Sequence, residues 1–537
     1  MKHNFEKYFL EELTKLRELS KDFVKNHPSV TSLLSTPSAD PDVERLLEGV
    51  AYLNAFIQRD LDNLYPPIAE FLLDLIYPHY LKQIPSLSIL EFTPKSVLKE
   101  KLKINKGTNF LSKPIEEVEC SYQNVWEMEV YPIDIDVKSD TFEISFDIHS
   151  SVKIEKLPFF INAPYSKAIK IFRYFHQHLK YITISDKKTV KKIDFIGFTK
   201  GIFSEYNEFN PYSILQEYFI FIEKFLLFEI EINQKECEVK FVFNEVLDFE
   251  IEKGDIKFFC SPIINIYQTD TDPIEVDFKK ECINLNNYTA NKIYSIDKIM
   301  GFRDGKKVIY NRFNGYEDFE NSYDLIRRKS IKDDGFETCL ILHLKDLKFT
   351  KEVLSINIKA TNSNWCDNLK TGDICMPSDN SPELVEFKNI TRVTKEIDTP
   401  SNDKFLWKFV SHLNINITGI KNVDDFKEIL KHYVYEYGKD KGIIYKNIKK
   451  IEGILGFRTK FINKLYKGQI IQGLEVYLDI SQENFVNIDD VYLFGLVIQY
   501  FLATYVTINN FISLKITEKM SGEVIICKSI VGNKELI

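Results

Sequence analysis

The spacing of the apolar residues changes along this chain, and that change limits the folds that it can adopt. In residues 1–80, apolar side chains recur every three or four positions, which is the period of an amphipathic helix. From about Leu87 the period becomes two. In TFEISFDIHS, residues 141–150, apolar and polar side chains alternate as in a half-buried strand. Both periods occur after residue 403. We therefore expect an α+β fold with a helical N-terminal segment, a β-rich middle and a mixed α/β C-terminal domain.

These changes predict four segments. Residues 1–85 are expected to form a helical, bundle-forming region, and residues 86–375 a β-rich region of two subdomains, sandwich- or barrel-like. The polar stretch over residues 376–403 is expected to connect domains. Residues 404–537 are expected to form a mixed α/β domain, which is a candidate for dimerisation.

The C-terminal segment predicts two helices and a hairpin. DDFKEILKHYVYEYG, residues 424–438, reads as a capped amphipathic helix. DDVYLFGLVIQYFLATYV, residues 489–506, reads as a strongly buried helix. FISLKITEKMSGEVIICKSI, residues 511–530, predicts two strands that are joined by a Ser521-Gly522 turn.

The N-terminal region contains two predicted helices with apolar stripes. The first ends at His27-Pro28. The second starts with Asp40 as N-cap and Pro41 at the first helical position, where the missing N–H of proline costs nothing. Its apolar residues follow the 3-4-3-4 spacing of an a/d seam. Because such stripes require a covering surface, nine residues are candidates for a subunit interface: Phe9, Leu13, Leu16, Phe23, Val43, Leu46, Val50, Leu53 and Ile57.

Two ways of covering the second helix stay open. It can pack on the first helix within one chain, or it can pack on a helix of another chain. Both contacts can also exist together on opposite faces. A third segment with helical spacing, IAEFLLDLIYP over residues 68–78, extends the region.

Residues 213–230, SILQEYFIFIEKFLLFEI, are rich in aromatic and aliphatic side chains. A membrane span needs about 20 predominantly apolar residues, and polar or charged residues interrupt this run at positions 216, 217, 223, 224 and 229. The stretch is therefore expected to be buried against protein. Aromatic density beside a predicted sheet is usual in a protein core. We expect mainly internal core, with any surplus at an interface.

The composition argues against several classes of function. The net charge is −9, which argues against nucleic acid as a main partner. YKNIKK, residues 445–450, could form a local basic patch but is interpreted as a solvated strip. Neither a signal peptide nor an uninterrupted apolar span is found, so we expect a cytosolic protein without direct membrane insertion. The eight cysteines are scattered without Cys-x-x-Cys spacing, which favours free thiols.

The common sequence motifs of catalysis are absent. There is no Gly-x-Gly-x-x-Gly, Walker loop, His-Glu-x-x-His or Gly-x-Ser-x-Gly. His176 and His178 would share a face on a strand, but no third ligand follows by spacing, so surface histidines are favoured over a metal pair. His412 lies among apolar residues and is interpreted as a packed or interface histidine rather than a general base. The acidic turn at residues 269–273 lacks the spaced oxygen ligands of a calcium loop. We expect no catalytic residue, cofactor or metal, and thus a non-enzymatic assembly protein.

Seven segments carry a resemblance to a known family. They are SADPDVERLLEGVAYLNAFIQRDLD (38–62), LIYPHYLKQIPS (75–86), LQEYF with EKFL (215–226), SPIINIYQTDTDPIEVD (261–277), LWKFVSHLNIN (406–416), GLEVYL (473–478) and LFGLVIQYFLATYVTINNF (493–511). In this order they resemble TssF, a baseplate subunit of the bacterial type VI secretion system. Ile222 departs from the family, which commonly has proline there. The ending VIICKSIVGNKELI (524–537) replaces a basic, Trp-Pro-containing tail, so contacts of that tail are not carried over.

The resemblance implies a structural role. TssF-like proteins pair as two copies with one TssG, and TssK trimers attach to this unit. Six such wedges surround a VgrG spike, with TssE near the sheath. The complex nucleates tube and sheath, docks from the cytoplasm on the inner membrane complex and triggers contraction. No catalysis or cofactor is known for the family. The alternatives are a wedge protein of a related extracellular contractile particle or phage-like tail, and a soluble β-rich enzyme.

Overall fold

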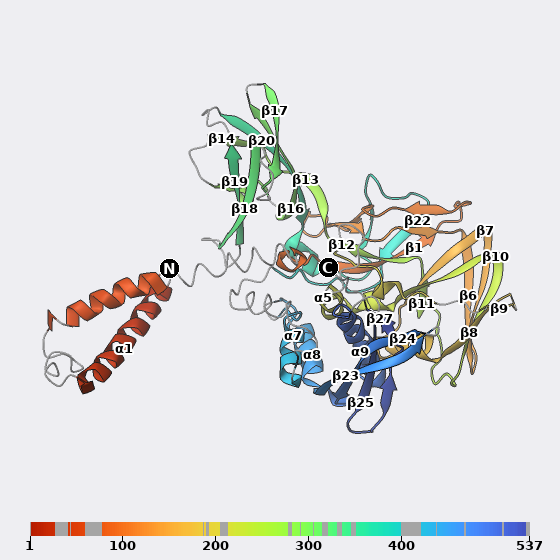
Figure 1. Ribbon diagram of the computed structural model, residues 1–537. Coiled ribbons are helices and arrows are strands. Elements are labelled where there is room, and N and C mark those ends of the chain that lie inside the picture. Colours follow the sequence, from red (N-terminus) through yellow and green to blue (C-terminus); the bar gives the residue numbers. More distant parts are fainter. Residues whose placement is uncertain are drawn as a thin grey trace. The chain divides into compact units, whose positions relative to one another are not determined.

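The chain divides into two compact units. The first comprises Met1–Leu81 with Pro400–Ile415, and the second comprises Lys82–Thr399 with Asn416–Ile537. The protein is drawn in Figure 1 from a computed structural model. The structure describes residues 2–26, 41–42, 44–58, 78–185, 187–189, 193–203, 213–277, 282–289, 291–303, 305–313, 321–329, 336–344, 351–398, 420, 422–435, 438–466, 469–506 and 510–532.

Two helices make up most of the described part of the first unit. α1 spans Lys2–Asn26 and ends directly before His27-Pro28, as predicted. The second helix spans residues 41–58, with residue 43 outside the described residues, and it includes the predicted first position at Pro41. A short 3₁₀ turn, η2, spans Pro78–Leu81. The predicted helical segment at residues 68–77 lies outside the described residues.

The first sheet of the second unit joins strands from distant parts of the sequence. β1 pairs antiparallel with both β12 and β22. β22 belongs to residues 376–403, which were predicted to connect domains, and as far as Asn389 this segment also supplies a strand of the first sheet. Val385 and Asn389 are buried in the sheet, which explains why the chain pairs here although its composition is polar. The strands in spatial order are β21 (Ile374–Pro377), β3 (Asn109–Ser112), β4 (Ser121–Asn124), β12 (Cys260–Ile264), β1 (Leu87–Pro94) and β22 (Val385–Asn389).

The second sheet carries the aromatic core. Ile144, Phe146 and Ile148 of β7 are buried, as the period of two predicts, whereas Phe142 lies just before the strand and is exposed. The ring of Phe146 packs 5.1 Å from that of Phe241 on β10. The strands in spatial order are β11 (Ile256–Phe258), β7 (Glu143–Ile161), β10 (Leu227–Phe243), β8 (Leu179–Ile184) and β9 (Lys187–Thr189), and β6 (Ile133–Ser139) also pairs with β7.

Residues 213–230 belong to this core. Every residue of α5 (Ser213–Ile220) is buried, η5 (Ile222–Leu226) follows, and β10 begins at Leu227. The prediction that this stretch is mainly internal core is confirmed. Two charged side chains are enclosed with it, because Glu217 and Lys224 form an ion pair with no exposed side-chain surface. The other short helices near this sheet are α4 (Tyr165–Arg173), η3 (Tyr174–His178) and η4 (Ile196–Phe198).

The third sheet has its own hydrophobic core, which includes Ile299, Tyr310, Leu340 and Ile356. The division of residues 86–375 into two β-rich subdomains stays a prediction, since these residues lie in one compact unit. A small ribbon of β2 (Leu102–Ile104) and β5 (Met128–Val130) lies outside it. The strands of the third sheet in spatial order are β13 (Tyr267–Asp270), β20 (Glu352–Thr361), β16 (Lys292–Arg303), β17 (Lys306–Arg312), β18 (Asn321–Lys329), β19 (Phe336–Leu344) and β15 (Ile283–Asn284), and β14 (Ile274–Val276) also pairs with β20. The connecting 3₁₀ turns are η6 (Leu285–Asn287) and η7 (Ser363–Asn368).

Helices and strands mix after residue 422, as predicted. α7 spans Val423–Lys431 and does not reach the predicted end at Gly438. Backbone bonds from Tyr433 N to Leu430 O and from Val434 N to Lys431 O turn the chain after the helix. The turn buries both side chains, so burial of these apolar groups ends the helix early.

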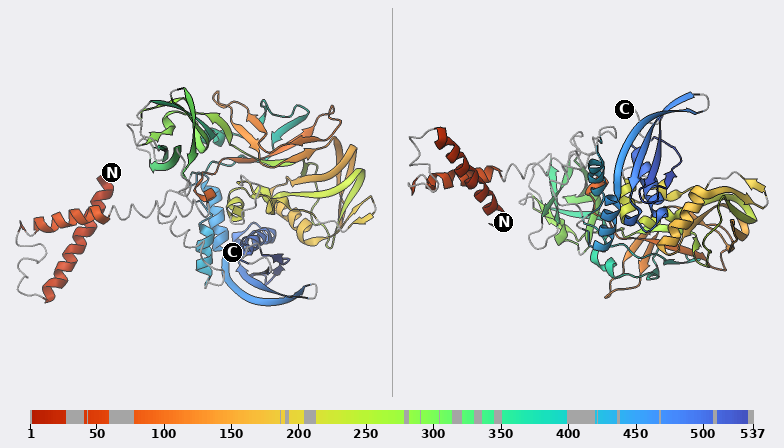
Figure 2. Two further views of the ribbon diagram at one scale, coloured as in Figure 1. Left: turned by 45° about the horizontal axis from the view of Figure 1, so that its top comes forward. Right: turned by 90° about the horizontal axis from the view of Figure 1, so that it is seen from below.

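The C-terminal sheet is covered by α9 (Ile488–Ala503), which packs along β25 and is buried on nearly all sides, as predicted. Figure 2 shows α9 beside this sheet and the long ribbon of β23 and β24 curving away from it. Gly522, with φ +73°, forms the predicted turn between β25 and β26. The remaining elements are α8 (Lys441–Glu452), β23 (Ile454–Tyr466), β24 (Gln469–Ile480), η9 (Gln482–Asn484), β25 (Phe511–Glu518), β26 (Val524–Ile526) and β27 (Ile530–Val531).

Candidate assembly surface of the N-terminal helices

One face of the second helix is covered within the first unit. Ala51 and Ala55 lie one turn apart and are fully buried. An ion pair joins the two helices, because Arg17 Nη2 of α1 donates to Glu44 Oε1 of the second helix. Leu13 of α1 is buried as well. The Arg17–Glu44 ion pair therefore joins the two helices, and Ala51 and Ala55 mark a buried face of the second one.

The predicted a/d seam occupies a different face of the second helix. The exposed fraction is 68% for Leu46, 41% for Val50, 63% for Leu53 and 59% for Ile57. We call these four residues the seam. Val43, the first residue of the predicted stripe, lies outside the described residues. Helical geometry explains the separation, since positions 51 and 55 point about 100° or more away from positions 46, 50, 53 and 57.

The candidate residues on α1 divide in the same way. Leu13 is buried, Phe9 and Leu16 are half-buried, and Phe23 is exposed. Leu10 and Leu19, which the sequence analysis did not select, are also exposed. Several large apolar side chains therefore face solvent on the two helices, and exposed apolar surface of this kind is typical of interaction sites. The assignment of these residues to a subunit interface stays a prediction.

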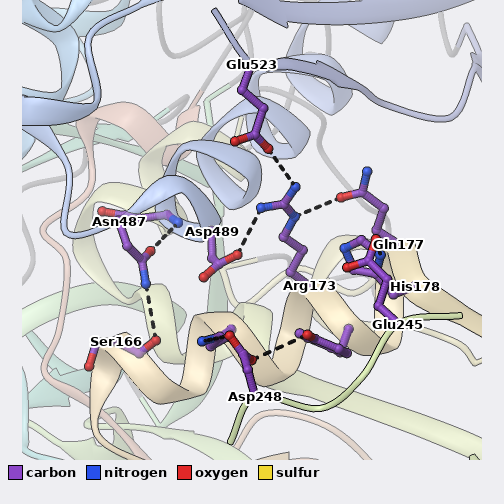
Figure 3. A network of polar contacts seen from close by, with 12 residues as sticks. Ser166, Arg173, Gln177, His178, Glu245, Asp248, Asn487, Asp489 and Glu523 are labelled. Carbon is purple, nitrogen blue, oxygen red and sulfur yellow. Dashed lines mark hydrogen bonds and ion pairs between the residues drawn. The ribbon is translucent and has the colours of Figure 1, made fainter. Parts of the chain in front are cut away.

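A group of charged side chains in the second unit offers the clearest alternative to an assembly role. Arg173 of α4 donates to Asp489 of α9 at 3.1 Å and to Glu523 at 3.3 Å, and its Nε donates to Gln177 at 2.9 Å (Figure 3). Arg173 and Asp489 are both largely buried. These contacts join α4 to the C-terminal domain, and each charge is neutralised by a neighbour of the same chain.

A second buried cluster lies beside it. Lys450 Nζ donates to Asp490 Oδ1 at 2.7 Å and to the Tyr218 hydroxyl at 3.0 Å, and the Tyr165 hydroxyl donates to the same Asp490 oxygen at 2.7 Å. Burial lowers the pKa of Lys450, and the attraction of Asp490 opposes that effect. Because Asp490 has no exposed surface, the cluster holds α8, α9, α4 and α5 together and does not present a charge to a substrate.

The histidine pair does not adopt the geometry considered in the sequence analysis. His176 and His178 lie in η3, a π-helical turn, and not on a strand. His176 Nδ1 is 2.6 Å from the Tyr492 hydroxyl, and His178 Nδ1 is 3.1 Å from Glu245 Oε1. Both are half-buried, so the interpretation as plain surface histidines is wrong. Burial lowers the pKa of His178.

The other candidate ligands have contacts within the protein. In the turn at residues 269–273, Asp270 accepts from Asn357 at 2.9 Å and the Thr271 N–H donates to Ile356 O. His412 lies outside the described residues. Across the described ranges, no group of three or more His, Cys, Asp or Glu side chains could hold a metal ion. All eight cysteines are free, as predicted.

We predict that replacing His176 and His178 together by alanine leaves the metal content of the purified protein unchanged. The loss of the His176–Tyr492 contact should cost about 1–3 kcal/mol of folding stability, because the tyrosine hydroxyl stays buried without its partner. Elemental analysis and thermal unfolding measure the two effects. Loss of a stoichiometric metal from the variant would contradict this account.

Sequence reasoning missed the enclosed charges. Glu217, Lys224 and Lys450 are buried in ion pairs. For Glu217 and Lys224 the available signal was their position inside an otherwise apolar run. Lys450 lies in YKNIKK, which the sequence analysis interpreted as a solvated strip, and for Lys450 this interpretation is wrong because its side chain is buried in an ion pair with Asp490. No helix in the described part of the chain is long and apolar enough to cross a membrane.

Comparisons with known proteins agree over nearly the whole chain. A family model described as "Type VI secretion system, TssF" matches residues 1–534. The type VI secretion system component TssF1 of Pseudomonas aeruginosa is 22% identical, and the alignment covers 96% of this chain and 97% of TssF1.

Two solved structures have a similar fold. A chain of the TssK-TssF-TssG baseplate subcomplex of a type VI secretion system, determined by cryo-electron microscopy, gives a TM-score of 0.72 at 21% identity, over 92% of this chain and 99% of that chain. A chain of the baseplate complex from the type VI secretion system gives a TM-score of 0.59 at 19% identity, over 99% of this chain and 100% of that chain.

Proposed function

This chain belongs to the TssF family of the type VI secretion system, and we propose that it is a wedge subunit of the baseplate that binds TssG and TssK. The observation that carries the proposal is the family match over residues 1–534, and the fold agrees with a chain of a TssK-TssF-TssG subcomplex. The exposed seam on the second helix supports binding to another chain.

The seam fits a helical partner in particular. Its residues repeat at three- and four-residue steps over the second helix, which is the pattern that packs against a second helix by knobs-into-holes contacts. On another face of the same helix, Ala51 and Ala55 are fully buried. We propose that the pair of helices enters a shared bundle with TssG, and that Phe9, Leu16 and Phe23 of α1 border the contact.

Further partners follow from the family. We propose that two copies of the chain pair with one TssG, that TssE and the VgrG spike are neighbours in the assembled baseplate, and that the complex works in the cytoplasm at the inner membrane complex. We propose a structural role without catalysis. The clusters around Arg173 and Lys450 support this, because their charges serve contacts between helices of the chain.

The test is co-expression of the full chain with TssG. We expect a soluble complex of two copies of this chain with one TssG, whereas the chain alone should self-associate, since its seam remains exposed to solvent. Native mass spectrometry measures both states. A stable, monodisperse monomer that does not bind TssG would contradict the proposed function.

A further inference from the structure

The ribbon of β23 and β24 extends beyond the rest of the C-terminal sheet. The two strands pair from Ile454–Ile480 out to Tyr466–Gln469, but β25 pairs with β24 only from Gly473 onward. Residues 463–466 and 469–472 therefore form a ribbon of two strands, which projects from the body of the unit in both views of Figure 2. An isolated two-stranded ribbon is marginally stable in water, so a third strand beside it would stabilise it. We call residues 460–466 and 469–472 the arm.

The arm has one apolar and one basic face. Phe461 stands opposite Leu474, which is buried in the core. Phe461 itself is 60% exposed, and Ile470 further along the same face is 75% exposed. The face of the sheet that packs on the core thus continues into the arm, where its apolar side chains are exposed to solvent.

Lys460 and Lys464 alternate with Phe461 along β23 and lie on the opposite face. Lys464 Nζ is 4.8 Å from the centre of the Phe511 ring and donates to Ser529 Oγ at 2.8 Å. Lys460 stands opposite Glu475 in the ladder, but within the described residues it forms no ion pair, and Glu475 pairs with Lys515. Residues 453–474 contain four cationic residues and no Asp or Glu, although the whole chain carries a net charge of −9. We therefore expect that a surface which binds the arm carries acidic side chains.

The second sheet contains a matching open edge. β6 pairs with β7 and with no other strand among the described residues. Its residues alternate: Ile133, Ile135 and Val137 line a groove of about 490 Å³. Phe92 and Phe258 also line this groove, as do the charged residues Glu91, Glu252, Lys253 and Lys257. Asp134 and Asp136 lie on the opposite face of the strand and are exposed. β6 thus carries apolar side chains on one face, and on the other it carries Asp134 and Asp136 together with Lys138, which pairs with Asp147 of β7.

We propose that the arm of one copy adds as a strand to β6 of a second copy of this chain. Addition at this edge places Phe461 and Ile470 over the groove and, on the other face, Lys460 and Lys464 beside Asp134 and Asp136. The apolar face of the arm then meets the apolar face of β6, and its lysines meet the two aspartates. Main-chain hydrogen bonds along the free edge add to the binding, as in other β-augmentation contacts. The inference rests on the proposed function, in which the chain acts in more than one copy. The phosphates of a nucleic acid would neutralise the lysines, but they would leave the apolar side chains of Phe461 and Ile470 exposed to solvent.

The contact is heterologous, since each copy offers an arm and a groove. One such contact leaves one arm and one groove free, so repetition produces a ring or an open chain of subunits. This property suits a subunit that surrounds a central spike.

The test uses two full-length copies with different tags, each purified with TssG. One carries Ile470→Cys and the other Ile135→Cys, and a short bismaleimide links thiols that lie close together. We expect a mixed cross-linked dimer. The matched control replaces Ile135→Cys by Ile309→Cys, an exposed strand residue of the third sheet. The protein without added cysteines reports any background from native thiols.

A charge exchange then tests the arrangement of faces. Lys460→Glu with Lys464→Glu should lower the cross-linked yield about tenfold or more, because like charges meet across the contact. Asp134→Lys with Asp136→Lys in the other copy should restore it. Equal yields with the Ile135 and Ile309 partners, or no recovery after the exchange, would overturn the inference. Binding of a DNA duplex that the arm substitutions abolish would also overturn it. Loss of TssG from all variants would instead contradict the proposed function.

Discussion

We expect Leu53→Asp to abolish binding to TssG while the isolated chain stays folded. Leu53 is largely exposed, so the new carboxylate stays hydrated in the free chain and should change its stability by no more than about 0.5 kcal/mol. In a helical bundle the same carboxylate would be buried without a partner, at a cost on the order of several kcal/mol. Co-purification with TssG and circular dichroism of the isolated chain measure the two effects.

Arg45→Asp is the matched control. It places the same carboxylate on the same helix, but position 45 points away from the seam. The ion pair of Arg45 with Asp42 lies at the surface at 3.6 Å and contributes little. TssG binding should therefore survive. Should Leu53→Asp melt the N-terminal helices instead, the seam packs within the chain, and should it change neither binding nor stability, the seam has no role in assembly.

The positions of many helices and strands in the sequence could be predicted because these elements have a periodic apolar pattern. The second helix, β7, β24 and α9 all occur where the period indicates them. The end of α7 could not be predicted in this way, because burial of Tyr433 and Val434 in the core decides it and the local sequence continues to favour a helix. Pairing of β22 with β1 joins residues about 300 positions apart, and a composition argument on a polar segment cannot detect it.

Only part of the candidate surface could be predicted from the sequence. The pattern identified the seam, but it could not decide between a cover from α1 and a cover from another chain. The structure separates these faces, since Ala51 and Ala55 lie buried while Leu46 and Leu53 stay exposed. The two alanines do not belong to the stripe of large apolar side chains, so the stripe could not predict that their face is buried. The arm was missed for a similar reason, because the free edge of β24 at residues 469–472 depends on where β25 begins.

The enclosed ion pair in residues 213–230 gives the largest expected effect on stability. Lys224 donates to Glu217 Oε2, and neither side chain has exposed surface. Burial lowers the pKa of Lys224, and the neighbouring Glu217 opposes that effect. Lys224→Met removes the counter-charge and leaves Glu217 buried alone. We expect a loss of about 3–5 kcal/mol in the free energy of unfolding, measured as a lower denaturation midpoint of the strand-rich unit.

Lys156→Met is the control for the substitution itself. Lys156 pairs with Glu229 at 2.9 Å across β7 and β10, in the same sheet, but half of its side chain is exposed. Loss of this pair should cost about 1 kcal/mol or less, because solvent screens it.

The double variant Glu217→Gln with Lys224→Met should recover most of the loss. Glutamine removes the buried charge and keeps the oxygen that accepts from the Ile202 N–H, which Glu217 Oε1 does at 2.8 Å. Replacement of a buried ion pair by neutral groups of similar volume is often close to neutral in stability. The comparison therefore separates two causes. If the uncompensated charge destabilises Lys224→Met, neutralising its partner restores the midpoint, and if lost packing around Lys224 is responsible, the double variant unfolds as early as the single one.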